Sequence, residues 1–283
     1  MDWRGRRQST NIEDRRGGGM GGGPLKVGGM GVVVVLILGV LFGVDLSPLV
    51  GGGGGRGGPV VVGEAPTDAQ SQENKEFVGV VLAETEDVWG AVFQGSGLDY
   101  TQPRLVLFSG VDRSACGTAQ SAMGPFYCPN DQTVYLDTDF FNVMTQRLGS
   151  RGEFARAYVI AHEVGHHVQD ELGVLGQVNA QRARASEAQS NALSVRVELQ
   201  ADCYAGLWAR AAKDRLALTD DDIRSALDTA ARIGDDALQR TSQGIVVPDS
   251  FTHGSSEQRQ TWFYKGFQTG DPSACDTFQA RTL

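Results

Sequence analysis

The sequence predicts an α+β protein in which a mostly helical domain with a small sheet follows a glycine-rich arm and one transmembrane helix. After residue 75, apolar residues recur at helical spacing over most of the chain, and only two short runs, 104–108 and 133–137, have the composition of strands. Of the 38 glycines, 20 lie in the first 63 residues. The 283 residues, 41% of them hydrophobic, are enough for one globular domain with a tail of different composition.

Residues 1–26 form a basic arm. Six Lys and Arg against three Asp and Glu give this arm a net charge of +3, so the rest of the chain carries −9 − 3 = −12. We do not expect so glycine-rich an arm to fold alone. Because phosphate binding depends on clustered Lys and Arg, an acidic balance without a basic run excludes a nucleic-acid partner.

Residues 27–44 contain no charged residue and have the length of a short membrane span. A cleaved signal peptide and a buried strand are the alternatives. No small-x-small cleavage site follows, and glycine-rich flanks supply no neighbours for a buried strand, so an uncleaved transmembrane signal anchor is favoured. With the basic side N-terminal, the chain is predicted to lie in the inner membrane as a single-pass protein with everything after Asp45 on the periplasmic side.

Residues 45–74, rich in Gly and Pro, are predicted to be a flexible linker, and residues 75–283 the folded domain. The domain is expected to begin with a helix up to about Gly95, followed by the strands Arg104–Phe108 and Thr133–Asp137 and a helix at about Phe140–Arg147.

The next helix, at about Phe154–Leu172, carries the pattern His162-Glu163-Val164-Gly165-His166. Residues four apart share a helix face with Cβ atoms about 5–6 Å apart, so His162 and His166 are placed to bind one zinc ion. Glu163 points roughly 100° away around the axis, where it can reach a metal-bound water, and is therefore the candidate general base.

His167 offers a rival register, because it stands four residues after Glu163. That pairing would leave the site without a base, so His167 is predicted to be an outer partner or a solvated residue. Three of the chain's four histidines fall within six residues, which favours a metal site over solvated histidines.

The third ligand is predicted on the following helix, at about Glu187–Lys213. Glu198 is the candidate, and Asp202, four residues later on the same face, is placed to accept the outer N–H of a ligating histidine and fix its tautomer. Cys203 lies about 100° off that face and is a poor ligand.

Thr219 is predicted to cap a helix that ends near Gly234, with Asp220–Asp222 at its positive N-terminus; a calcium site at these acidic residues is the weaker alternative. A final helix is predicted from the capping-box spacing of Ser255 and Gln258.

His253 is the only histidine outside the metal-binding helix, and it directly precedes this last helix. It is a candidate catalytic electrophile that stabilises the oxyanion, with an exposed loop residue as the alternative; Tyr204 and Tyr264 are poorer candidates for the same role.

The four cysteines allow three pairings, and the predicted location is oxidising. Cys116–Cys128 is the natural local pair. Cys203–Cys275 would then tie the third-ligand helix to the C-terminal tail.

Three motifs carry a resemblance to the bacterial YpfJ-type neutral zinc metallopeptidase family: His-Glu-Val-Gly-His-His at 162–167, Glu-Leu-Gln-Ala-Asp-Cys-Tyr-Ala-Gly at 198–206 and Thr-His-Gly-Ser-Ser-Glu-Gln-Arg at 252–259. The resemblance runs from about Phe77 to Phe278 and also includes the glycine-rich arm and the apolar segment before them. It implies a zincin-like domain, zinc as the cofactor, and Glu198 and Asp202 in the roles argued above. Because zincin-like peptidases hold extended substrate on a strand before the zinc helix, Tyr135 is a candidate for that edge, with a plain core strand as the alternative.

The chain is therefore expected to be a membrane-anchored zinc metallopeptidase acting on a peptide or protein, in which a zinc-activated water attacks the peptide bond and Glu163 is the general base. A zinc amidase acting on cell-wall peptides would share every ligand. A catalytically inactive zinc-containing envelope scaffold is the other alternative, although structural zinc sites usually close with four protein ligands.

Overall fold

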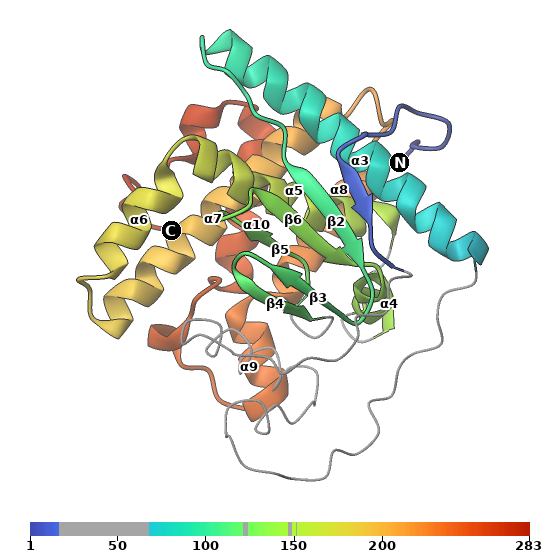
Figure 1. Ribbon diagram of the computed structural model, residues 1–283. Coiled ribbons are helices and arrows are strands. Elements are labelled where there is room, and N and C mark those ends of the chain that lie inside the picture. Colours follow the sequence, from blue (N-terminus) through green and yellow to red (C-terminus); the bar gives the residue numbers. More distant parts are fainter. Residues whose placement is uncertain (17–67, 121–123, 147–148, 151) are drawn as a thin grey trace.

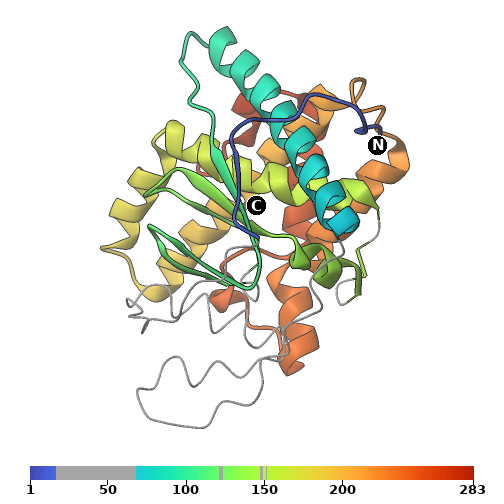
Figure 2. The ribbon, with the colours of Figure 1, turned by 45° about the vertical axis from the view of Figure 1, so that its right-hand side comes forward.

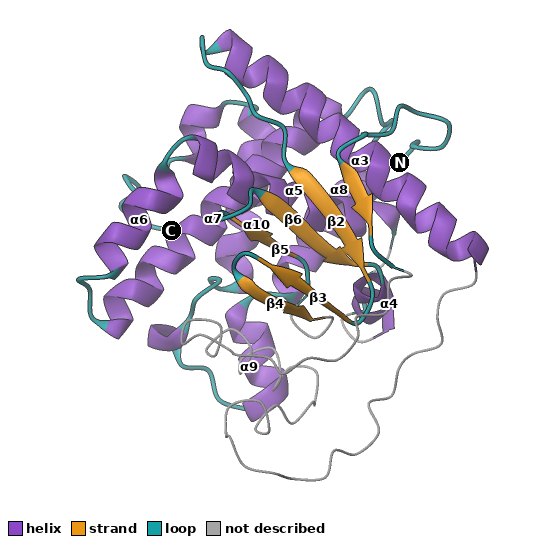
Figure 3. Ribbon diagram, viewed as in Figure 1, coloured by secondary structure: helices purple, strands orange, loops and turns teal. Residues whose placement is uncertain are grey.

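The computed structural model of the chain describes residues 1–16, 68–120, 124–146, 149–150 and 152–283. A four-stranded sheet forms one layer, helices pack against it, and a separate two-stranded hairpin lies beside it (Figures 1 and 3). Helix α5 (Glu153–Glu171) packs against the sheet, α7 (Glu187–Ala212) packs on α5, and α10 (Ser256–Thr269) packs on α7. The described residues are thus mostly helical with a small sheet.

The sheet has the strand order β1-β2-β6-β5. Strands β1 (Ile12–Asp14), β2 (Arg104–Phe108) and β6 (Thr133–Asp137) are parallel, and β5 (Phe126–Cys128) pairs antiparallel with β6. β6 is therefore an inner strand, and β5 is an edge.

Side chains of β2 and β6 alternate between two cores. Leu105 and Val134 face the helices, whereas Val106 and Tyr135 belong to a small cluster that includes Ala119. Ala119 comes from the separate hairpin of β3 (Val111–Ser114) and β4 (Gly117–Gln120). Burial on both faces explains why the two strands read as nearly continuous apolar runs.

The helices predicted from apolar spacing are present, most of them with boundaries shifted by one residue. The first helix, α3, begins at Asp68, seven residues before the predicted start and inside the stretch predicted as a linker. α6, α9 and the β3–β4 hairpin were not predicted. The remaining helical elements are α3 (Asp68–Gly95), α4 (Asp139–Gln146), α6 (Val174–Arg182), α8 (Asp220–Arg232), α9 (Asp235–Gln243), and the 3-10 turns η2 (Pro248–Ser250) and η3 (Pro272–Cys275).

Capping boxes fix the starts of three helices. Thr219 caps α8 together with Asp222, and Ser255 caps α10 together with Gln258, as the sequence predicts. A further box at Ser186 starts α7, the helix that carries Glu198.

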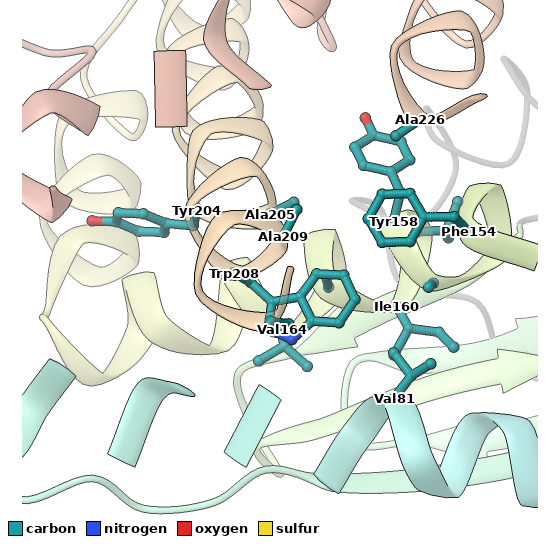
Figure 4. Close-up of a cluster of buried hydrophobic side chains, with 14 of the residues drawn as sticks. Val81, Phe154, Tyr158, Ile160, Val164, Tyr204, Ala205, Trp208, Ala209 and Ala226 are labelled. Atoms are coloured by element: carbon teal, nitrogen blue, oxygen red, sulfur yellow. The ribbon is translucent and has the colours of Figure 1, made fainter. Parts of the chain in front are cut away.

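Two close approaches hold α5, α7 and α10 together. Gly165 of α5 faces Ala201 of α7, where an added Cβ would lie 3.1 Å from the Ala201 carbonyl oxygen. Gly206 of α7 and Gly266 of α10 face each other's helices so closely that a Cβ on either would lie 1.9 Å from a backbone oxygen. Around these crossings the core is apolar, with Trp208 of α7 among side chains of α5 (Figure 4).

Both predicted disulfides are present. Cys116–Cys128 joins the turn of the β3–β4 hairpin to β5, and Cys203–Cys275 joins α7 to η3. With both disulfides formed, none of the described cysteines is free.

The N-terminal residues 1–16 are part of this same fold. β1 extends the sheet beside β2, and the Trp3 side chain is only 3% exposed and makes an edge contact with Phe77 of α3 at 5.3 Å. In Figure 2 this segment runs along α3 to the sheet. Arg7 reinforces the contact through ion pairs with Glu86 and Asp87.

The predictions of a fold with a transmembrane helix and of a single-pass inner-membrane location are wrong. No helix within the described ranges is both long and apolar enough to cross a membrane, and the longest two, α3 and α7, contain several charged residues each. The predicted span, 27–44, lies outside the described residues.

The strand pairing also shows how residues 1–16 pack. Because β1 and β2 share one sheet, these residues are joined directly to the domain that residues 68–283 form. An uncharged run and a basic flank satisfy the criteria for a signal anchor, but these local criteria contain no information about where the flanking segments pack.

Candidate metal centre

Helices α5 and α7 bring three candidate ligands together. His162, His166 and Glu198 each offer one atom, and these atoms all lie within 4.8 Å of one another. His162 Nε2 is 3.1 Å from Glu198 Oε2, and His166 Nε2 is 3.6 Å from Glu198 Oε1. The close approach at Gly165 allows this meeting, because Ala201 lies one turn after Glu198.

The outer nitrogen of His162 is held by Asp202. His162 Nδ1 lies 2.9 Å from Asp202 Oδ1, and the Asp202 side chain is fully buried. An ionised carboxylate only accepts hydrogen bonds, so Nδ1 carries a proton and Nε2 is the nitrogen directed to the site. Burial opposes protonation of the ring, but Asp202 and Glu198 together raise the pKa of His162 to about 10, so a metal ion that binds Nε2 must displace a proton from it.

The outer nitrogen of His166 is held by Gln169, one turn further along α5. The Gln169 amide nitrogen donates to the Val197 carbonyl at 2.7 Å and to Gln200 Oε1 at 3.0 Å. Its oxygen, 2.8 Å from His166 Nδ1, therefore accepts a hydrogen bond from the N–H of that nitrogen. Both ligand histidines thus present Nε2 to the same point.

This donor set fits zinc. Two imidazole nitrogens and one carboxylate are the ligands of many catalytic zinc sites, which keep a fourth position open. Burial disfavours the charge on Glu198, but the neighbouring histidines hold the pKa of its carboxyl group well below the usual range, so it remains a carboxylate ligand. Among the described residues this is the one group of three or more such side chains close enough to hold a metal ion.

Glu163 lies beside the cluster and is 8% exposed. Burial raises the pKa of its carboxyl group to about 7, and the charge of Glu198 acts in the same direction, whereas His162 and the backbone amide of Tyr127 oppose the shift. A carboxyl group with a pKa near 7 suits proton transfer in both directions at neutral pH.

The Tyr127 amide belongs to β5, so the edge strand of the sheet lies next to Glu163. Tyr135, the sequence-based candidate for a substrate edge, is on the inner strand β6 and stacks against Phe126 at 5.1 Å. The edge beside the metal site is therefore formed by β5, a strand that the sequence did not reveal.

His167 is buried and turned away from the metal cluster. Its Nε2 lies 2.6 Å from the Thr101 carbonyl oxygen and its Nδ1 lies 3.1 Å from the Tyr127 hydroxyl. The Tyr127 hydroxyl also bonds to Asp170 at 2.9 Å, so this group fastens β5 to α5. Cys203, the other rival ligand, is in a disulfide.

His253 is held by Asp235, the first residue of α9. Asp235 Oδ2 accepts hydrogen bonds from the backbone amides of Thr252, His253 and Gly254 at 2.6–2.9 Å, and Oδ1 lies 3.2 Å from His253 Nδ1. Burial lowers the pKa of His253, but Asp235 and the charge of Glu198 outweigh it and raise that pKa. His253 is thus close enough to Glu198 to sense its charge, while a third of its side chain remains exposed.

The two tyrosines considered for the same role are elsewhere. Tyr204 packs against Trp89 at 5.2 Å in the core, and Tyr264 is 44% exposed.

Sequence reasoning missed Gln169, Asp235, Tyr158 and Arg259. Gln169 carried a signal, since a polar side chain three residues after His166 falls near the ligand face of α5. Arg259 lies in the motif at 252–259 that resembles the family, although its position in the sequence alone assigns it no role. Tyr158 also carried a signal, because it stands four residues before His162 and so falls on the same face of α5. Asp235 gave none, because its partner His253 is distant in the sequence.

The chain matches the family described as "Putative neutral zinc metallopeptidase" over residues 1–278. It is 47% identical to "Uncharacterized protein YpfJ" of Escherichia coli (strain K12), over 98% of this chain and 99% of that protein. It is also 49% identical to "Uncharacterized protein Rv2575" of Mycobacterium tuberculosis, over 69% of this chain and 68% of that protein. No solved structure matches it.

Proposed function

The chain belongs to the family described as "Putative neutral zinc metallopeptidase", and from this membership and the geometry of the site we propose that it is a zinc-dependent peptidase. The observation that carries the proposal is the position of Glu163, a buried carboxyl group with a pKa near 7, beside three convergent ligand atoms.

His162, His166 and Glu198 would hold the ion. When bound, zinc acts as a Lewis acid and lowers the pKa of water from about 15.7 to about 7. Glu163 takes a proton from the attacking water and later passes it to the leaving amine, so one group serves as base and then as acid.

His253 stabilises the oxyanion in this proposal. Asp235 fixes its ring through Nδ1 and raises its pKa, which favours the form with N–H on both nitrogens, so that Nε2–H is available to donate. The substrate class is an extended peptide. Its backbone would pair with the edge strand β5, whose Tyr127 amide lies next to Glu163.

The test is cleavage of a peptide library by the zinc-loaded full chain and by Glu163→Gln. Removing the base should lower kcat by roughly 10²–10⁴-fold, while the variant keeps one zinc per chain because all three ligands remain. A wild-type chain that binds zinc and cleaves no peptide, or a Glu163→Gln variant as active as wild type, would contradict the proposal. Muropeptide substrates in the same screen would reveal a cell-wall amidase instead.

A further inference from the structure

We propose that Arg259 is a positioning residue for the metal site, acting through Asp202 to fix the orientation of His162. This inference rests on the proposed metal site and adds a residue that touches neither the ligand atoms nor a substrate.

Arg259 lies in the first turns of α10 and is 3% exposed. Its Nε donates to Asp202 Oδ2 at 2.8 Å and its Nη2 donates to Asp202 Oδ1 at 3.0 Å, so the guanidinium makes a bidentate contact with the carboxylate. Burying two opposite charges is favourable only when their geometry is good and their remaining donors and acceptors are satisfied. This pair meets that condition, since Nη1 also reaches the Ile233 carbonyl at the end of α8 at 3.4 Å.

Asp202 is held from α5 as well. The Tyr158 hydroxyl donates to Asp202 Oδ1 at 2.5 Å, and Arg259 Nη2 lies 3.3 Å from the same hydroxyl. Tyr158 stands one turn before His162, whose Nδ1 bonds to the same carboxylate oxygen. The carboxylate plane is therefore fixed by α5, α7 and α10 together, and with it the direction in which His162 presents Nε2.

Without Arg259, Asp202 would lose the hydrogen bonds that hold Oδ2 and Oδ1 from α10, and would keep only the Tyr158 hydroxyl and His162 as partners, both at Oδ1. Its carboxylate would then be free to turn about its side-chain bonds, and His162 would lose a fixed acceptor. Arg259 therefore maintains the orientation of Asp202.

The same segment also carries His253, six residues earlier, on the loop that Asp235 holds. Residues 252–259 thus position two parts of the site, one through a loop and the other through the first turns of α10. The proposed reaction uses only His253 from the motif 252–259, and the contact of Arg259 with Asp202 gives a second residue of that motif a role.

The test compares wild type with Arg259→Lys and Arg259→Gln. Lysine keeps the positive charge, but its ammonium group does not reproduce the bidentate hydrogen bonding of a guanidinium. Zinc affinity is measured by competition with a chelator, the site geometry by the visible spectrum of the Co²⁺-substituted protein, and folding by thermal unfolding of the metal-free protein. Arg215→Lys is the matched control, because Arg215 pairs with Glu84 through one nitrogen at 2.8 Å, outside the metal site.

Both Arg259 variants should bind zinc roughly 10–100-fold more weakly, the range typical for losing an outer partner of a metal ligand. The Co²⁺ spectrum should change, and kcat should fall more than KM changes. Arg215→Lys should match wild type in zinc affinity and spectrum. The double variant Asp202→Asn with Arg259→Lys should bind zinc no more weakly than Asp202→Asn alone, because both changes break one interaction.

Wild-type zinc affinity and spectrum in Arg259→Lys, with only the unfolding temperature lowered, would overturn the proposal and leave Arg259 a purely structural residue. Additive losses in the double variant would overturn the route through Asp202. If Arg259→Gln does not fold, Arg259→Lys decides alone. Zinc affinity is measured without substrate. The role of Arg259 in the metal site can therefore be judged even if the chain proves to have no peptidase activity.

Discussion

His162 and His166 each have one ring nitrogen occupied by a buried acceptor, and this decides which nitrogen faces the metal site. Asp202 holds the first ring, and Gln169 holds the second. The two acceptors differ in charge, so their removal should have different effects: Asp202 also anchors Arg259, whereas Gln169 belongs to a neutral chain through Gln200 to the Cys275 carbonyl.

At this residue scale, Glu198→Ala should lose nearly all zinc binding, because a carboxylate ligand is removed. Asp202→Asn should bind zinc about 10–100-fold more weakly and retain some activity, since all three ligands remain. Metal analysis after gel filtration, with chelator competition for affinity, separates the two. If Glu198→Ala kept tight binding and Asp202→Asn matched wild type, the third ligand would lie elsewhere and His253 would be the next residue to test.

His253→Ala should lower kcat by roughly 10²–10³-fold, as expected for losing one oxyanion donor, and should keep zinc. Asp235→Asn should give a smaller loss, because the ring remains but its pKa is no longer raised by a carboxylate. Steady-state kinetics on a cleavable peptide provide the measurement. Tyr264→Phe is the control, since that side chain is largely exposed; equal kcat for His253→Ala and wild type would remove His253 from the mechanism.

At the scale of elements, the crossing of α7 and α10 depends on two glycines. A Cβ on Gly206 would lie 1.9 Å from the Phe263 carbonyl oxygen, so Gly206→Ala must separate the helices and should destabilise the fold by about 1–3 kcal/mol or more. Gly176→Ala is the control: its Cβ meets nothing within 4 Å on the exposed face of α6, and it should stabilise by about 0.5–1 kcal/mol. Urea unfolding measures both, and similar values for the two variants would contradict the close crossing.

The N-terminal segment is the second element to test, because it packs on a domain that begins more than fifty residues later. Trp3→Ala should destabilise the full chain by about 3–5 kcal/mol, the usual cost of emptying a buried tryptophan site. Trp3→Phe should cost much less, since it retains the edge contact with Phe77. Urea unfolding of both variants is the measurement. No loss in Trp3→Ala would mean that residues 1–16 do not contribute to the core.

At the scale of the whole molecule, the metal site joins helices whose packing defines the domain. Zinc should therefore stabilise the folded chain by RT ln(1 + [Zn]/Kd), about 4 kcal/mol at a thousandfold excess over Kd. For a chain of this size that corresponds to an increase in Tm of roughly 8–16 °C. Differential scanning calorimetry with and without zinc checks it. Glu198→Ala should show no such increase, and an equal increase there would place the stabilising zinc at another site.

The sequence by itself predicted which side chains meet at the candidate metal centre. His162 and His166, and likewise Glu198 and Asp202, are related by the four-residue period of a helix, and that local geometry is readable from spacing. The helices that carry them and the pairing of the four cysteines were predicted for similar reasons, since helical periods are local and one cysteine pair closes a short loop.

Only the tertiary structure decided what surrounds those side chains. Arg259 bonds to Asp202 across 57 positions of sequence, and β1 pairs with β2 although their residues are more than ninety positions apart. The transmembrane anchor was predicted from hydropathy, which describes one segment by itself, whereas the pairing of β1 depends on a partner that its own segment does not encode. Periodicity fixes the face on which a side chain lies, but which other face it meets is set by the packing of the whole chain.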